Sequence, residues 1–459
     1  MMPPSRPVRA AMTLVEMLVA MAATLILIAA VAQVFGAFGS AISGSRAAIG
    51  IEARLRTAAY RLRDDLAGVT VQMLPPRDPG QGEGYFEVIE GPRADADANG
   101  VDANGIEVLA ADIDDVLLFT TRSNGTPFIG RGPAGTQFEG TVAEVAWFAR
   151  PTVPATTPAT YTLYRRQLLV MGSVGAAPFT TGTAAFSAFG GTWADYYSFP
   201  CDVSARLEGS TLVPNTLGDL TRRENRFMHG DGIANGAVFP YGFVVHQTAS
   251  TSLAGDVLPT MSLGLIFDEN SARRGEDIVL TNVLSFDVRV FDPAVPVSVT
   301  PAVPVSVTDP GRTALVPGDP GLVDASLSKS LVAAGGYVDL GHGVTSNAVL
   351  TGVTPPFGGN GAAKSQLVGS ATTRRTYCTW STHYEANGRD DSQPANSLVD
   401  EGTDGLDNDG NSLVDEGGEQ ETSPPYPYSL RGVEVRIRCY EPTSRQVRQV
   451  TVRQSFVLK

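Results

Sequence analysis

The sequence predicts an α+β protein in which one long N-terminal α-helix packs on an elaborated antiparallel β-sheet domain with long loop insertions. Two observations predict the helix: residues 17–38 form an apolar run of membrane length, and an amphipathic stripe follows it. A third predicts the sheet. The chain holds 49 glycines and 31 prolines among its 459 residues, a composition that favours turns and strands over helices.

The apolar run begins after a short cationic leader. Residues 1–11 contain Arg6 and Arg9 but no acid, and a positive flank tends to stay cytoplasmic while the next segment crosses the membrane. As a helix, the run would extend for roughly 33 Å, enough for a bilayer core of about 30 Å. Glu16 stands at the head of the run. A carboxylate near a bilayer centre costs about 2.5–3.5 kcal/mol, so this glutamate is expected to have a specific partner.

The helix is expected to continue beyond the membrane segment. Apolar residues recur at helical spacing with charged residues between them, which is typical of a helix with one buried face. The members of this stripe are Ile51, Leu55, Leu62 and Leu66. Glycines cluster where the two halves join, and a bend or local melting is expected there. These glycines are Gly36, Gly39, Gly44 and Gly50.

Residues 10–66 resemble the N-terminal signal and helix of type IV pilins and type II secretion pseudopilins. The resemblance implies that a prepilin peptidase cuts between Ala11 and Met12, that Met12 becomes the methylated first residue, and that Glu16 becomes the fifth. Ala11 stands where the family usually has Gly, and Met12 where it usually has Phe. The other readings of this segment are a secretory signal peptide, whose small-residue cleavage site would follow the apolar run, and a plain membrane anchor, which would not need Glu16.

Filament assembly would explain Glu16 physically. A buried carboxylate needs a positive partner to offset its loss of hydration. The resemblance implies that the freed amine of Met12 in a neighbouring subunit supplies this charge and fixes the register between subunits. The expected organisation is a removed leader (1–11), a transmembrane and filament-core helix (12–39), an amphipathic helix (40–68) and a periplasmic β-rich domain (69–459).

Alternating apolar and polar residues predict the strands of this domain. They are expected at 86–89, 115–120, 142–148, 161–170, 261–267, 284–291, 433–440 and 447–457. The order of the helix and these strands along the chain resembles that of J-type minor pseudopilins. Insertions are expected at about 79–105, 175–245, 293–361 and 385–424. The third begins with Pro-Ala-Val-Pro-Val-Ser-Val-Thr twice in tandem, from Pro293 to Thr308, whose prolines suit edge or linker structure rather than a core strand.

Charge and cysteine content limit the possible functions. The net charge of −14 argues against nucleic-acid binding, which depends on basic patches, and is compatible with cation binding. The three cysteines are not spaced like a metal finger. An exported domain is expected to form one disulfide, with Cys201–Cys378 favoured among open alternatives, and Cys439 is expected to be a buried free thiol in a strand.

An acidic stretch near the C-terminus predicts a calcium site. Asn-Ser-Leu-Val-Asp-Glu-Gly occurs at 396–402 and again at 411–417, with Asp-Gly-Leu-Asp-Asn-Asp-Gly between the copies. Oxygen ligands at alternating positions, with Gly in tight turns, suit Ca²⁺. The stretch resembles the Asp-rich calcium repeats of bacterial surface proteins, and its Leu-Val pairs are expected to anchor on the core. The alternative is a solvated acidic loop. The candidate ligands are Asp400, Asp404, Asp407, Asp409, Asn411, Asp415 and Glu416.

A second, weaker calcium motif lies in the first insertion. Its spacing fits the first half of an EF-hand loop, although Glu107 falls one residue past the position of the usual bidentate ligand. The candidate ligands here are Asp95, Asp97, Asn99 and Asp102.

The sequence shows no HExxH, GxSxG or Walker motif, and no enzymatic activity is expected. The chain is expected to be a minor pseudopilin of a type II secretion system that takes part in pseudopilus assembly and protein export. Its expected partners are other pilins or pseudopilins, prepilin peptidase and the bacterial inner membrane, with the β-rich domain in the periplasm or on a filament. The alternatives are a minor type IV pilin or calcium-dependent adhesin on a surface pilus, and a membrane-anchored periplasmic enzyme.

Overall fold

The structure is a computed structural model of the whole chain. The residues that it describes are 13–74, 82–90, 112–113, 115–131, 137–152, 158–171, 202–208, 211–222, 225–227, 275–299, 314–319, 322, 330–343, 350–351, 353, 355–358, 376–380, 397–402, 404–415, 419, 426 and 428–457. The chain divides into two compact units, residues 1–53 with 441–447 and residues 54–440 with 448–459.

One helix, α1 (Leu14–Ala67), begins the described part of the chain. It is rich in Ala and Leu, which have high helix propensity. The helix is unbroken through the four glycines at the predicted join, so the local melting expected there is not seen. Its last turns, from residue 54 onward, lie in the second unit, where Leu55, Leu62 and Leu66 of the predicted stripe are buried together with Ala58 and Ala59.

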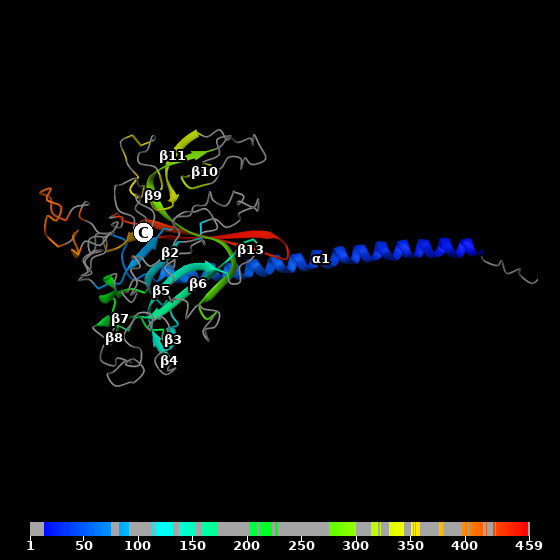
Figure 1. The fold of residues 1–459 in the computed structure, drawn as a ribbon, viewed down its shortest axis with the longest axis horizontal. Helices are drawn as coiled ribbons and strands as arrows, with labels where there is room; N and C mark the ends of the chain where they lie inside the picture. Colours follow the sequence, from blue (N-terminus) through cyan, green and yellow to red (C-terminus); the bar gives the residue numbers. More distant parts are fainter. Residues whose placement is uncertain are drawn as a thin grey trace, which may run out of the picture. The chain divides into compact units, whose positions relative to one another are not determined.

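A large antiparallel sheet forms the body of the second unit (Figure 1). Eight strands follow one another across it in the order β12-β1-β2-β5-β6-β9-β13-β14, and β10 and β11 also pair with β9. The bounds are β1 (Phe86–Ile89), β2 (Val116–Arg122), β5 (Val142–Pro151), β6 (Tyr161–Leu169), β9 (Ile278–Val299), β10 (Ala314–Leu315), β11 (Ser330–Val338), β12 (Thr376–Cys378), β13 (Gly432–Glu441) and β14 (Gln446–Ser455).

Most of the predicted strands are confirmed. The expected strand at 86–89 is β1, the expected hairpin of 142–148 with 161–170 is β5 paired with β6, and the C-terminal pair is β13 beside β14. The strand expected at 261–267 lies outside the described residues. Two small sheets were not predicted. One pairs β3 (Phe128–Arg131) with β4 (Gln137–Gly140), and the other pairs β7 (Ala205–Glu208) with β8 (Thr211–Pro214).

The prediction of an insertion loop from residue 293 is wrong for the first copy of the tandem repeat. Strand β9 continues through this copy to Val299 and pairs with β11 and β10. The alternating valines explain the difference, because Val295 and Val297 are buried in a small apolar cluster with Val316 and Val338. The pairing with β11 shifts register near Pro296, as expected where a proline interrupts the ladder. The second copy lies outside the described residues.

The cysteines differ in part from the expectation. Cys439 is a buried free thiol in β13, as predicted. Cys378 is also a buried free thiol among the described residues, and Cys201, its predicted disulfide partner, lies outside them. The sulfur of Cys378 accepts hydrogen bonds from Arg226 Nη1 at 3.2 Å and from the main-chain N–H of Trp380 at 3.4 Å. Arg226 also pairs with Glu87 at 3.0 Å, which fixes the guanidinium beside the thiol.

Candidate functional site

The first part of α1 exposes an apolar surface. Every described side chain from residue 13 to residue 39 is exposed, including the leucines, isoleucines and phenylalanines of the run. The helix is long and apolar enough to cross a membrane. Since exposed apolar area on this scale is unfavourable in water, the segment needs a membrane or other apolar helices around it.

Thr13 and Glu16 cap the beginning of this helix. The Thr13 main-chain N–H and hydroxyl donate to Glu16 Oε2 at 2.7 and 3.0 Å, and the main-chain N–H of Glu16 donates to the Thr13 hydroxyl at 3.2 Å. This reciprocal arrangement is a capping box, which satisfies N–H groups that the first helical turn leaves unpaired. Glu16 therefore has a local structural role. Both side chains are exposed, so the carboxylate stays accessible to a further partner. Ala11 and Met12, the predicted cleavage and methylation residues, lie outside the described residues.

The acidic loop near the C-terminus is a structural repeat as well as a sequence repeat. Ser397 and Ser412, at the same place in the two copies, have φ angles of 70° and 71°, and Asp400 and Asp415 have φ angles of 56° and 55°. Residues other than glycine seldom adopt this left-handed conformation. Its recurrence at equivalent residues indicates that both copies form the same turn.

Three carboxylates converge in this loop, two from the segment between the copies and one from just after the second copy. One oxygen from each of Asp407, Asp409 and Glu419 lies within 4.8 Å of the other two, close enough for a single ion to contact all three. Glu419 Oε1 accepts the main-chain N–H of Asp409 at 3.2 Å, while its Oε2 is buried and has no hydrogen-bond partner among the described residues. Glu419 itself was not predicted, because it lies outside the repeat and its spacing fits no EF-hand position.

The other predicted ligands of this loop lie outside the three-carboxylate group. Asp404 accepts the N–H of Leu406 at 2.8 Å and Asp415 accepts the N–H of Gly405 at 2.9 Å, so both carboxylates shape the loop. Asn411 lies beside the group and donates from Nδ2 to Asp409 Oδ2 at 2.9 Å. Asp400 adopts the left-handed turn described above. Glu416 and the whole second motif, Asp95, Asp97, Asn99 and Asp102, lie outside the described residues.

The expectation that the Leu-Val pairs anchor this loop is wrong. Leu398 and Val399 are 45% and 43% exposed, and Leu413 and Val414 are 59% and 53% exposed. The physical reason is that the loop is held by hydrogen bonds from its own main chain to its acidic side chains, such as Gly410 N to Asp407 Oδ1 at 2.7 Å. It therefore does not need apolar anchors and presents these side chains at its surface.

Sequence reasoning missed a second acidic region, buried in the large sheet. Two groups of three carboxylates that could hold a metal ion share Asp112. Their members are Glu90, Asp112 and Asp339 in one group and Asp112, Asp115 and Asp287 in the other. Apart from Asp112 and Asp115, these residues are single acids far apart in the sequence, so their spacing carries no signal. The run Asp112-Ile113-Asp114-Asp115 before a buried strand was the available hint.

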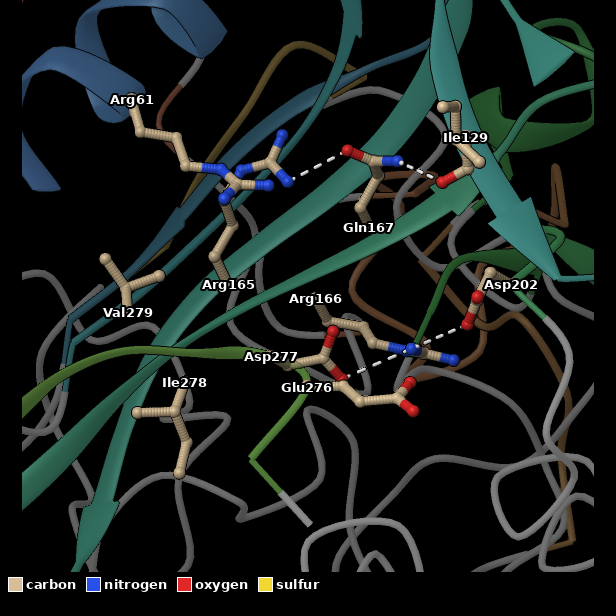
Figure 2. Close-up of a pocket in the computed structure, with 10 residues that line it drawn as sticks. All are labelled: Arg61, Ile129, Arg165, Arg166, Gln167, Asp202, Glu276, Asp277, Ile278 and Val279. Carbon is tan, nitrogen blue, oxygen red and sulfur yellow. Dashed lines mark hydrogen bonds and ion pairs between the residues drawn. The ribbon is translucent and has the colours of Figure 1, made fainter. Parts of the chain in front are cut away.

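A pocket of about 180 Å³ lies beside β6 in the second unit (Figure 2). Arg166 links Asp202 at 2.9 Å and Asp277 at 3.2 Å, while Arg165 donates to Gln167 at 2.9 Å. These contacts join β6 to the residue before β9 and to the segment that leads into β7. Most of the charges that line the pocket are paired with one another, so these contacts account for the local structure.

No family model, no curated protein and no solved structure matches this chain. The likeness to pilins is therefore one of architecture, a long apolar N-terminal helix whose last turns pack on an antiparallel sheet.

Proposed function

We propose that this chain is a pilin-like structural subunit, a minor pseudopilin of a type II secretion system that assembles through its N-terminal helix. The observation that carries the proposal is the exposed apolar half of α1 with an accessible carboxylate in its first turn. A plain membrane anchor needs the apolar surface, but an uncharged glutamine at position 16 would complete the capping box equally well, so an anchor does not need the charge. A filament subunit needs both, the surface to pack with neighbouring helices and the charge to fix the register.

In this proposal, prepilin peptidase removes residues 1–11 at the inner membrane and the new N-terminus at Met12 is methylated. The Glu16 carboxylate of one subunit then pairs with the Met12 amine of its neighbour. The sheet-rich unit lies in the periplasm, and no reaction is assigned to it. In this step the Glu16 carboxylate exchanges the Thr13 hydroxyl for the positively charged amine of the neighbouring subunit. The exchange is favourable because, once water is excluded, a full positive charge binds a carboxylate more strongly than a hydroxyl does.

Mass spectrometry of the mature N-terminus tests the proposal directly. The full-length chain would be expressed with and without a prepilin peptidase. We expect a methylated Met12 only when the peptidase is present. An N-terminus at Met1 under both conditions, or cleavage beyond residue 38, would contradict the proposal.

A second candidate function, a calcium-dependent adhesin on a surface pilus, is favoured by the exposed Leu-Val pairs of the acidic loop. Two apolar pairs held in equivalent turns form a repeated contact surface, and exposed apolar groups of this kind often mark binding sites. Replacing Leu413 and Val414 by serine is expected to abolish adhesion of pilus-bearing cells while leaving secretion intact if this candidate holds. Loss of secretion with adhesion unchanged would favour the pseudopilin.

We also propose that the acidic loop binds Ca²⁺ through Asp407, Asp409 and Glu419. The unpartnered, buried Oε2 of Glu419 supports an ion in addition to the convergence of the three carboxylates. Hard divalent cations prefer such all-oxygen sites, and Ca²⁺ accepts irregular loop geometry more readily than Mg²⁺ does. An ion would offset the mutual repulsion of the loop's acids and hold its two turns together.

A further inference from the structure

A buried group of five carboxylates lies where several strands of the large sheet end. Glu90 directly follows β1, Asp115 directly precedes β2, Asp287 lies within β9 and Asp339 directly follows β11. Asp112 lies three residues before Asp115. All five are at most 8% exposed. We call these residues the buried acidic cluster.

The curl of the sheet brings these residues together. Strands β2 and β9 are separated by β5 and β6 in the strand order, yet the segment before β2 contacts β9 directly. The N–H of Phe286 donates to the main-chain oxygen of Asp112 at 2.9 Å, and the N–H of Val288 donates to Asp115 Oδ2 at 2.6 Å. The backbone thus fixes Asp112 and Asp115 against β9, so their carboxylates are placed beside Asp287 by the fold itself.

Asp112 occupies the centre of the buried acidic cluster. One of its oxygens lies within 4.8 Å of oxygens from Glu90 and Asp339, and one lies within 4.8 Å of oxygens from Asp115 and Asp287. In Ca²⁺ sites the metal–oxygen distance is about 2.3–2.6 Å, so ligand oxygens on opposite sides of the ion are up to roughly 5 Å apart. Each group of three oxygens therefore fits around one ion of this size without rearrangement of the main chain.

The side chain of Asp112 lacks the partners that a buried carboxylate normally has. Both of its oxygens are fully buried, and neither has a hydrogen-bond partner among the described residues. By contrast, Glu90 accepts the N–H of Leu340 at 3.1 Å. Buried carboxylates are costly unless they are paired, hydrogen-bonded or bound to metal, and an unsatisfied group of this kind in a folded protein calls for an explanation.

The positively charged side chain beside the cluster, Arg289, does not supply a partner for Asp112. Arg289 is fully buried, and its Nε lies 3.1 Å from both Asp287 Oδ2 and Asp339 Oδ1, while its Nη1 lies 2.8 Å from Asp319. Arg289 therefore pairs with one member of each group of three carboxylates, Asp287 and Asp339, and leaves the Asp112 oxygens without a hydrogen-bond partner among the described residues. Asp112, on which both groups of oxygens converge, is left to a partner that the chain's own described side chains do not provide.

We propose that the buried acidic cluster is a divalent-cation site, with Asp112 as its central ligand and Ca²⁺ as the cation. Oxygen-only donors select hard cations over Zn²⁺ or copper, which prefer nitrogen and sulfur. An ion in the first group would join Asp112 to the ends of β1 and β11, and an ion in the second would join it to the start of β2 and to the middle of β9. This role is independent of the calcium-binding loop and of filament assembly.

The competing explanation is a protonated Asp112 with no ion. Burial raises the pKa of Asp112 well above its usual value, and the charges of Asp115, Glu90, Asp287 and Asp339 raise it further. A neutral acid would remove much of the repulsion, although its oxygens would still lack hydrogen bonds. The two explanations differ in the effect of Asp112→Asn on Ca²⁺ binding: only a metal site loses affinity when this carboxylate becomes an amide. The test below uses this difference.

The test uses the full-length chain in detergent, with Asp407→Asn and Asp409→Asn introduced to silence the loop site. In this parent, calorimetric titration with CaCl₂ is expected to show one ion bound per chain, and Ca²⁺ is expected to raise the unfolding temperature relative to EDTA. Adding Asp112→Asn is expected to weaken Ca²⁺ binding at least about tenfold, as loss of metal-site partners commonly does. In EDTA, the same variant is expected to unfold at or above the temperature of the parent, because an uncharged amide replaces an unpartnered acid.

Two further variants complete the experiment. Asp64→Asn removes an exposed acid from α1 and is expected to leave Ca²⁺ binding unchanged. Should Asp112→Asn fail to fold, Glu90→Gln decides, since its amide oxygen can still accept the Leu340 N–H while its negative charge is lost. Calcium affinity that is unchanged in both Asp112→Asn and Glu90→Gln would overturn the proposal, as would a parent that binds no Ca²⁺.

Discussion

The carboxylate of Asp65 and the guanidinium of Arg165 form a two-pronged ion pair, with Oδ1 2.6 Å from Nη2 and Oδ2 2.7 Å from Nε. Both side chains are 3% exposed. Trp147 Nε1 donates to the same carboxylate at 2.9 Å, and the hydroxyl of Thr121 donates to the main-chain oxygen of Asp65 at 2.7 Å. One residue in the last turn of α1 is thus bound to β2, β5 and β6, so the pair fixes the end of the helix on the sheet.

Replacing Asp65 by asparagine is expected to destabilise the protein by about 3–5 kcal/mol, because Arg165 is then left as a buried and uncompensated charge. The neighbouring exposed residue provides a matched control. Asp64→Asn is expected to change the free energy of unfolding by no more than about 0.5 kcal/mol. Urea unfolding followed by tryptophan fluorescence measures both, since Trp147 and Trp380 are fully buried. Equal stability of the two variants would contradict the anchoring role.

Glu16 has a capping role in the structure and a proposed role in filament assembly, and three variants distinguish the two. Thr13→Ala removes the capping hydroxyl, Glu16→Gln keeps a capping box but loses the charge, and Glu16→Ala loses both. If Glu16 pairs with a neighbouring amine, Glu16→Gln and Glu16→Ala are expected to insert normally but to incorporate poorly into filaments, whereas Thr13→Ala incorporates well. Crosslinking in membranes followed by filament shearing measures incorporation. Normal incorporation of Glu16→Gln would leave only the capping role.

Calcium binding by the acidic loop is expected to depend on the residues that converge in the structure rather than on all the predicted ligands. Glu419→Gln is expected to weaken Ca²⁺ binding at the loop by tenfold or more, because it removes the charge of a buried ligand. Asp404→Asn is the control, since its side chain can still accept the N–H of Leu406. Titrations would be made with Asp112→Asn present, so that only the loop is observed. A greater loss with Asp404→Asn than with Glu419→Gln would show that the ligand set is wrong.

The sequence was sufficient to predict the helix and strands whose apolar residues repeat regularly. The stripe through Leu55, Leu62 and Leu66 predicted the buried face of α1, and alternation in 433–440 predicted β13. Prediction from the sequence failed where the proline content and the alternation of apolar residues pointed to different structures. The prolines of the tandem repeat suggested edge or linker structure rather than a core strand. The valines between them, including Val295, are buried in an apolar cluster, and this burial outweighed the loss of ladder hydrogen bonds.

The candidate sites show a different limit of prediction from sequence. Sequence spacing found Asp407 and Asp409 because loop ligands are neighbours in the chain. It could not find Glu419, whose position depends on how the loop turns back, nor Asp112 and Asp287, which meet only because the sheet curls. Single acids in strands resemble ordinary surface residues in sequence. Only the three-dimensional arrangement reveals that they are buried.

The thiol of Cys439 is expected to be unreactive in the folded protein. Burial raises the pKa of Cys439 to about 12, and the nearby charge of Arg54 lowers it only in part. In an unfolded chain the pKa is about 8.5, so between about pH 8.5 and pH 12 the folded state holds a proton that the unfolded state releases. The contribution to stability is therefore complete below about pH 8.5 and declines as the pH rises through this window. Iodoacetamide at pH 8, with peptide mapping by mass spectrometry, is expected to modify Cys439 readily in urea and very slowly without it. Rapid modification of Cys439 in the native protein would show that β13 opens or that the thiol is not buried.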